Sequence, residues 1–300
     1  MTEDKEISPV EIQIPVPWGH IAGKVWGKTG DQCILAIHGK QDNCGVFDRL
    51  ISLFKGNYNI ICIDLPGHGF SSHFPSGIPL YFLNFVIAIA YVVKEIQWNR
   101  FILLGHSIGG QIGLFFTAIY PEYIQKLIVI DHISPMYVDD NQLVINLRKE
   151  FDDFVKLQNR LQNGTPPIYT YNEVLEKLIN RESALSTEAA KIVLKRSLLE
   201  KENGYSFCMD QRIKTCLFPS ITSYLVKDVV CNVNCPTLFL FSTERMKFYE
   251  KSYNDIFTLM KKKSNIIIKV VPGNHDVHQN HPERVVKLIE EFIIYENCKL

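Results

Sequence analysis

The stretch from Phe101 to Gly110 constrains this chain more than any other segment. Its sequence, FILLGHSIGG, is an apolar run of one strand's length that leads into Gly-x-Ser-x-Gly, and a helix-like run from Gln111 to Tyr120 follows. A serine on a sharp strand-to-helix turn sits in strained backbone, which small neighbours at Gly105 and Gly109 permit. Such a turn lifts the hydroxyl above a sheet and directs backbone N–H groups at the position of a developing oxyanion. The pattern therefore predicts that Ser107 is a nucleophile.

The length and charge of the chain exclude several classes of protein. Its 300 residues suffice for one α/β domain with an insertion, or at most two domains. Lysine plus arginine (32) equal aspartate plus glutamate (32), so we expect no nucleic-acid partner. The longest apolar stretch, Phe85 to Val93, is too short to span a bilayer, so no stable membrane insertion is expected.

The cysteines and the first residues indicate an intracellular protein. Eight cysteines are scattered, and the close pair Cys231 and Cys235 has no second pair with which to form a zinc site. Buried free thiols in a reducing compartment fit this distribution best. The polar start, MTEDKEIS, is unlike a secretory signal peptide. We expect a soluble protein, and no metal or organic cofactor is implied.

Strand-like and helix-like segments alternate along most of the chain. A polar–apolar alternation marks Val10 to Val16 as an edge strand, and a second strand, Ile21 to Trp26, follows after a turn. The further strand-like runs are Cys33–Ile37, Tyr58–Asp64, Ile124–Ile130, Thr237–Phe241 and Asn265–Val271, and the flanking helix-like runs are Pro79–Ile96, Tyr249–Lys261 and Pro282–Tyr295. Hairpin-like strands before buried ones predict a mixed sheet with an antiparallel start, and the alternation predicts a mostly parallel, doubly wound α/β fold.

The middle of the chain has a different character. Val138–Leu161, Tyr171–Arg181 and Ser186–Lys201 are charged segments with a 3.6-residue period, and no strand-like run occurs among them. We therefore expect a helical cap at residues 135–224, inserted into a core formed by residues 1–134 and 225–300.

The loop after the strand-like run Cys33–Ile37 has the composition of a catalytic support. In folds with a serine elbow, a His-Gly turn after an earlier strand supplies the second oxyanion amide, here the N–H of Lys40 beside that of Ile108. Each such donor is typically worth about 3 kcal/mol of transition-state stabilisation. His38 is expected to fix its turn by hydrogen bonds, and Asp64 and His68 are interpreted as turn residues.

A serine nucleophile needs a base and an acid that orients the base. His275 follows the last strand and is the predicted base, whereas His278 and His281 are better interpreted as loop or capping residues. Two acids are open. Glu244 follows the Thr237–Phe241 strand, the commonest place, and Asp131 ends an unbroken apolar strand, from which a carboxylate can also reach the base.

With these residues in place, the chain resembles the serine hydrolase-like proteins, a group within the α/β-hydrolase superfamily. The matching segments run from the first strand to the last helix and are Val16–Ala22, His38-Gly39 with Asp42-Asn43, Gly67–Gly69 with Ser71–His73, Gly105–Ser107, and Pro272–His275 with His278. Two departures are Lys40-Gln41 in place of the usual Trp-Leu, and Met209–Arg212, which keeps only part of an Arg-Asp-Gln-Arg run. The resemblance implies an α/β-hydrolase fold and a serine hydrolase, and it does not supply the natural substrate.

We expect hydrolysis of a small-molecule carboxylic ester, or else of a thioester or amide, through Ser107, His275 and an acid. Two alternatives stay open, because a hydrolase fold can also bind a small ligand without turnover or transfer an acyl group to an acceptor other than water. The tail Cys298-Lys299-Leu300 is close to the Ser-Lys-Leu peroxisomal address. It predicts a peroxisomal import receptor as partner and a peroxisomal location with a cytoplasmic fraction.

Overall fold

The computed structural model describes residues 8–27, 32–133, 142–215 and 221–294. An eight-stranded sheet runs through it in the order β1-β2-β4-β3-β5-β6-β9-β10. Its strands are β1 (Val10–Val16), β2 (Gly19–Trp26), β3 (Gln32–Ile37), β4 (Tyr58–Ile63), β5 (Phe101–His106), β6 (Ile124–Ile130), β9 (Thr237–Ser242) and β10 (Ile266–Val271). The pairs β1–β2 and β2–β4 are antiparallel and the others are parallel, which confirms the mixed sheet with an antiparallel start.

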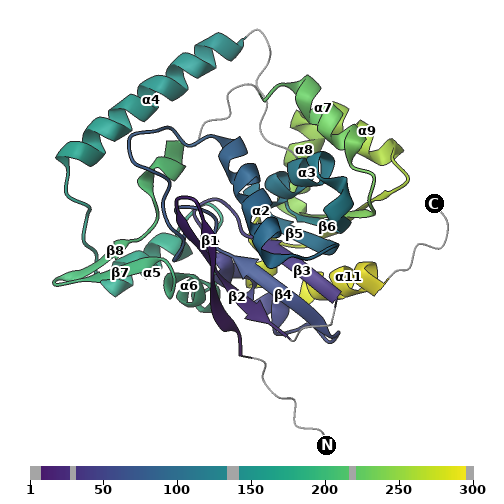
Figure 1. The fold of residues 1–300 in the computed structure, drawn as a ribbon, viewed down its shortest axis with the longest axis horizontal. Helices are drawn as coiled ribbons and strands as arrows, with labels where there is room; N and C mark the ends of the chain where they lie inside the picture. Colours follow the sequence, from purple (N-terminus) through teal and green to yellow (C-terminus); the bar gives the residue numbers. More distant parts are fainter. Residues whose placement is uncertain (1–7, 28–31, 134–141, 216–220, 295–300) are drawn as a thin grey trace, which may run out of the picture.

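Helices cover both faces of this sheet, so its central strands are apolar on both sides (Figure 1). Successive residues of β3 point to opposite faces, since Leu35 and Ile37 join one apolar cluster while Ile34 and Ala36 join the other. The first cluster includes α2 (Phe82–Ile96), α3 (Ile108–Ile119) and α7 (Ser223–Asn232). The second includes η1 (Cys44–Phe47), α1 (Asp48–Ile51), α6 (Thr187–Leu194), α10 (Val277–Asn280) and α11 (Glu283–Ile294). Unbroken apolar strands are the expected signature of a sheet buried on both faces.

Two expected helices outside the helical insertion differ from the structure. The run Tyr249–Lys261 is not one helix but the ends of two, α8 (Thr243–Ser252) and α9 (Asn254–Lys262), which meet at Tyr253. Helix α8 begins early because the Ser242 hydroxyl caps it by accepting from the N–H of Arg245. Helix α2 begins at Phe82 rather than Pro79, because Tyr81 is still extended.

The segment between β6 and α7 forms the helical insertion, which lies to the left in Figure 1. It contains α4 (Leu143–Asn163), α5 (Tyr171–Ile179), α6, the hairpin β7 (Leu198–Lys201)–β8 (Gly204–Phe207), and η4 (Gln211–Thr215). The hairpin corrects the expected helical segment Ser186–Lys201, because the helix ends at Leu194 and residues 198–201 form β7. Its strands are short and β7 is mostly exposed, so their apolar pattern is weak. The turn signal is Asn203-Gly204, in which Gly204 adopts a φ of +138°. The predicted cap boundary at residue 224 falls in the first turn of α7, which packs on α3.

Three sequence predictions concern membranes, the cysteines and the chain end. Within the described residues, no helix is both long and apolar enough to cross a bilayer. The six cysteines that the structure describes form no disulfide with one another. The tail Cys298–Leu300 lies outside the described residues, so the peroxisomal location stays a prediction.

Candidate active site

Ser107 occupies a strained turn between β5 and α3. Its φ of 53° and ψ of −121° lie outside the regions that most residues adopt. The two flanking glycines are required sterically, because a Cβ at Gly109 would collide with the carbonyl of Ile37, and a Cβ at Gly105 with the carbonyl of Gly109. The backbone N–H of Ser107 donates to the carbonyl of Ile130 (3.0 Å), which fixes the turn against the neighbouring strand β6. The strained elbow that the sequence predicts is present.

The structure brings together three of the predicted side chains. The Ser107 hydroxyl lies 2.9 Å from Nε2 of His275, and Nδ1 of His275 lies 2.7 Å from Oδ2 of Asp131. With Nδ1 protonated, as the contact with the carboxylate requires, Nδ1–H donates to Asp131 and Nε2 accepts from the serine. Ser107, His275 and Asp131 follow the carboxyl ends of β5, β10 and β6, so this hydrogen-bonded relay of three side chains lies at one edge of the sheet.

Asp131 rather than Glu244 is the carboxylate that contacts His275, the predicted base. Asp131 is fully buried in a left-handed conformation (φ 56°), and its second carboxylate oxygen accepts from the N–H of Ser242 at 2.6 Å. Glu244 lies exposed in the first turn of α8, and no hydrogen bond joins it to His275, although the structure describes both residues. No contact between Glu244 and His275 therefore supports the alternative in which Glu244 orients the base.

Neutral histidines surround the base. The Nε2–H of His106 donates to the backbone carbonyl of His275 (3.0 Å), and the ring of His278 packs in a tilted arrangement against that of His106, at 4.0 Å between centroids. Burial lowers the pKa of His106 well below its ordinary value, and burial together with the charge of His275 lowers the pKa of His278 to about 3. Burial likewise lowers the pKa of His132, the residue after Asp131. These rings stay uncharged at neutral pH, so they do not compete with His275 for a proton.

The two predicted oxyanion amides follow the carboxyl ends of adjacent strands, β3 and β5. Ile108 is the first residue of α3, and the first N–H groups of a helix have no partner within it. Lys40 lies in the turn after β3, the strand that pairs with β5. His38 fixes this turn, because its Nδ1 lies 2.7 Å from the carbonyl of Gly39 and its Nε2 accepts from the N–H of Leu65 (2.9 Å). The contacts agree with a supporting role for His38.

His68 and Asp64 each make a contact within their own turn and a second contact with a distant part of the chain. His68 accepts from the N–H of Gln41 at Nε2 (3.2 Å) and contacts the carbonyl of Pro66 at Nδ1 (3.0 Å). Asp64 accepts locally from the N–H of Phe70 (2.9 Å), and it also pairs with Arg196 of the helical insertion at 2.7 Å. Sequence reasoning missed Arg196, since 132 residues separate it from its partner.

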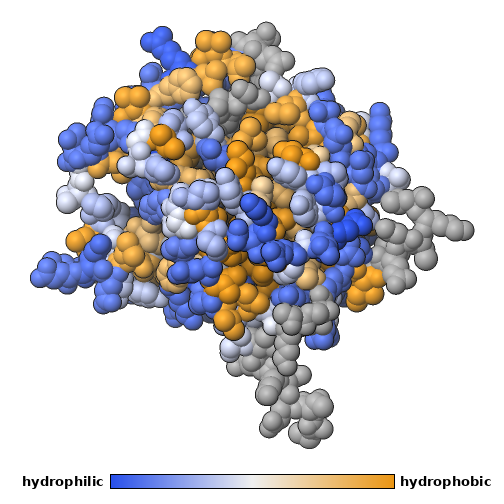
Figure 2. Space-filling view, in the orientation of Figure 1, coloured by the Kyte–Doolittle hydropathy of each residue, from blue (hydrophilic) through white to orange (hydrophobic). Residues whose placement is uncertain are grey.

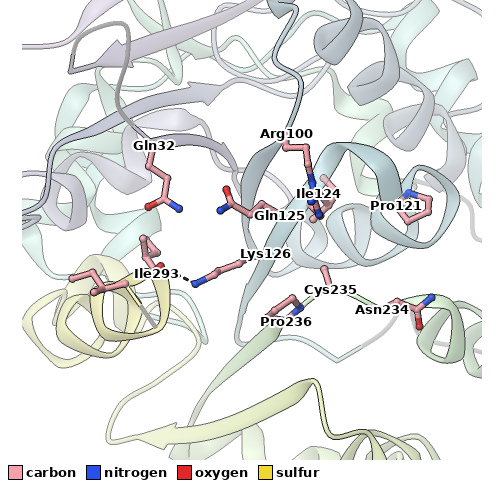
Figure 3. A pocket seen from close by; sticks show the side chains of 11 residues that line it. Gln32, Arg100, Pro121, Ile124, Gln125, Lys126, Asn234, Cys235, Pro236 and Ile293 are labelled. Atoms are coloured by element: carbon pink, nitrogen blue, oxygen red, sulfur yellow. Dashed lines mark hydrogen bonds between the residues drawn. The ribbon is translucent and has the colours of Figure 1, made fainter. Parts of the chain in front are cut away.

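A pocket of about 680 Å³ lies away from this site (Figure 3). Its walls include Gln32, Arg100, Ile124 and Pro236, which lie at the amino ends of β3, β5, β6 and β9. The relay stands at the carboxyl ends of the strands, so this pocket is not where Ser107 would meet a substrate. Its Lys126 donates to the carbonyls of Phe292 and Ile293 and thereby caps α11.

Comparison with known proteins agrees with the fold. Residues 33–165 match the family model described as the alpha/beta hydrolase fold. A serine hydrolase-like protein from Danio rerio is 32% identical over 94% of this chain and 88% of its own length. The structure of a hypothetical protein from Pseudomonas aeruginosa superposes with a TM-score of 0.84 at 24% identity, covering 95% of this chain and 99% of that one. A thioesterase domain from the curacin biosynthetic pathway superposes with a TM-score of 0.77 at 19% identity, covering 94% and 99%.

Proposed function

The chain belongs to the serine hydrolase-like proteins of the α/β-hydrolase fold, and on that premise we propose that it hydrolyses a carboxylic ester with Ser107 as nucleophile. The observation that carries the proposal is the pair of hydrogen bonds from Ser107 to His275 (2.9 Å) and from His275 to Asp131 (2.7 Å). A hydroxyl, an imidazole and a buried carboxylate in this order are the parts that nucleophilic catalysis by serine requires.

In the proposed reaction, His275 transfers protons in two steps, acylation of Ser107 and hydrolysis of the acyl-serine. As the Ser107 oxygen bonds to the substrate carbonyl carbon, its proton passes to Nε2 of His275, and Asp131 stabilises the imidazolium. The amides of Lys40 and Ile108 donate to the oxyanion, which collapses to an acyl-serine while the leaving alcohol takes the proton from His275. Water then attacks the acyl group and gives a proton to His275, which passes it to the Ser107 oxygen as the ester bond to serine breaks. The acid product and the free Ser107 hydroxyl are thereby released.

The same residues can attack related acyl compounds. The structural likeness to a thioesterase domain makes a thioester the alternative substrate to test beside the oxygen ester. Transfer to an alcohol in place of water uses the same acyl-serine, and product analysis with added alcohols measures it. The binding-protein alternative is weakened, because it drew on the lack of a clear acid and Asp131 contacts the base directly.

The deciding experiment compares wild type with Ser107→Ala on oxygen esters and thioesters of graded acyl length, together with labelling by a fluorophosphonate probe. We expect wild type to turn over part of the panel and to label. The variant should lose several powers of ten in kcat and fail to label, while its circular dichroism stays unchanged. A folded variant with near-normal turnover would refute the assignment of Ser107, and an unlabelled, inactive wild type would favour the binding protein.

A further inference from the structure

The segment that carries the base is fastened to the helical insertion. This His275 segment, residues 272–280, runs from the end of β10 through α10. The side-chain amides of Asn274 and Asn280 both donate to the carbonyl of Ala184, at 3.0 and 2.9 Å. In return, the N–H of Ser186 donates to the side-chain oxygen of Asn280 at 2.7 Å. Residues 184–186 thus contact the His275 segment on both sides of His275.

Arg181 adds an ion pair to these contacts. Its Nη2 lies 2.9 Å from Oδ2 of Asp276, the residue directly after His275, and its Nε donates to the carbonyl of Ser183 at 2.7 Å. The Asp276 side chain is only 2% exposed and that of Arg181 is 28% exposed. Nη1 of Arg181 also faces Asp42, at 4.0 Å from Oδ1. The guanidinium therefore lies between two buried carboxyl groups, one of which is joined by a peptide bond to the base.

A metal ion is the rival occupant of this place. Side-chain ligand atoms of Asp42, His106 and Asp276 lie within 4.8 Å of one another, and Nδ1 of His106 has no hydrogen-bond partner among the described residues. Yet the guanidinium already supplies a positive charge to both carboxyl groups, and a divalent cation beside it would be repelled. The arrangement thus favours an arginine that anchors the His275 segment.

We propose that Arg181 is a positioning residue, which acts through Asp276 to hold His275 in line with Ser107 and Asp131. This inference rests on the proposed function. Without the guanidinium, Asp276 keeps a buried negative charge that has lost its partner, and the segment relaxes to expose it. A shift of about 1 Å in a catalytic group can cost about 100-fold in rate. The helical insertion therefore contributes to alignment of the base as well as lying beside the site.

The test uses Arg181→Gln, Arg181→Lys and Asp276→Asn in the full chain, with Arg160→Gln in exposed α4 as the matched control. We expect kcat and the rate of fluorophosphonate labelling to fall about 10- to 100-fold in Arg181→Gln and Asp276→Asn, while KM changes little. Arg181→Lys should recover part of the loss, and the double variant Arg181→Gln/Asp276→Asn should be no worse than the worse single variant, because both remove one interaction. Arg160→Gln should match wild type.

Hydrogen exchange gives a second readout that needs no turnover. The amides of Val277, Gln279 and His281 donate to carbonyls within the His275 segment and should exchange faster in Arg181→Gln. Wild-type exchange there, or wild-type kcat in folded Arg181→Gln and Asp276→Asn, would overturn the proposal. If Arg181→Gln does not fold, Arg181→Lys and Asp276→Asn decide by the same criteria. Failure of wild type to label refutes the proposed function instead, and the exchange result still decides whether Arg181 holds the segment.

Discussion

Every residue of β5, the strand before Ser107, is buried, whereas none of the residues of α4 in the helical insertion is. Strand β5 packs on both faces against apolar side chains, so hydrophobic burial fixes its position. Helix α4 lies at the outer edge of the insertion, where Val144 and Ile145 are 78% and 63% exposed, and Figure 2 shows apolar atoms at the top of the view over this helix. The sheet and the insertion are therefore held by different interactions.

Buried arginines fasten the inner part of the insertion. Arg196 pairs with Asp64 at 2.7 Å and lies 4.3 Å above the ring of Phe70. Arg212 pairs with Asp210 at 2.6 Å and donates to backbone carbonyls in the loop 74–78. Hydrophobic burial has no direction, but each of these contacts fixes a distance and an angle. Burial of apolar side chains thus positions the strand ends, while polar contacts determine how the insertion packs against them.

The largest expected effect is on Asp131, the buried carboxylate at the end of core strand β6. Asp131→Asn keeps the shape of the buried acid but presents an amide where His275 needs a carboxylate, so we expect kcat to fall on the order of 10⁴-fold. Glu244→Gln, on the exposed first turn of α8, should leave kcat within about twofold of wild type. Steady-state kinetics on the best ester of the panel measures both. Equal and modest losses would mean that neither carboxylate orients the base.

The next effect tests whether charge fastens the insertion. Arg196→Met keeps an unbranched apolar stem but leaves Asp64, which is fully buried, without its cation, so stability should fall by about 3–5 kcal/mol. The control Arg148→Met removes an 86% exposed arginine whose partner Asp152 is 4.0 Å away, and should cost less than about 1 kcal/mol. Urea unfolding compares the two. Similar losses for both variants would argue against ionic attachment of the insertion.

Acid should destabilise the fold. Burial lowers the pKa of His38 to about 4 and that of His278 to about 3, and it lowers those of three further histidines well below the ordinary value, His68, His106 and His132. Below about pH 6.5 the unfolded chain binds protons that these buried rings do not, so stability falls as the pH drops toward 4. Each titrating ring adds up to about 1.4 kcal/mol per pH unit.

A carboxyl group acts in the opposite sense. Burial raises the pKa of Asp42 to about 7 against the pull of Arg181, so the folded state holds that proton and loses stability as the pH rises from 4 to 7. Burial also raises the pKa values of Asp48 and Glu150, and the five histidines outnumber these three carboxyl groups. His278→Phe, whose ring would pack against His106 and Phe47 as the imidazole does, should reduce the pH slope of urea-measured stability by about one proton. An unchanged slope would show that His278 does not titrate on unfolding.

The smallest effect separates two parts of the insertion itself. Val155 in α4 is 56% exposed, so Val155→Ala should change stability by less than about 0.5 kcal/mol. Val174 in α5 is fully buried, and Val174→Ala should cost about 1–2 kcal/mol through lost burial. Thermal or urea unfolding measures both, and a larger loss at Val155 would reveal a packing role for α4.

Local pattern alone determined much of this protein. Periodicity and turn chemistry located the strands of the sheet, the strained turn at Ser107 and the loop of His275, because each depends on neighbours within a few residues. The same reasoning missed the β7–β8 hairpin and the division between α8 and α9. Short exposed strands leave a weak apolar pattern, and a serine cap can start a helix before its periodicity is visible.

Only the tertiary structure decided which distant groups meet. Asp131 and Glu244 both follow strands, and the sequence could not choose between them, because the choice depends on where β6 and β9 end relative to β10. The pairs Arg196–Asp64 and Arg181–Asp276 join residues 132 and 95 positions apart. No local rule predicts such pairs, because the partners are brought together by packing of the whole chain. Their hydrogen bonds then fix directions that hydrophobic burial leaves open.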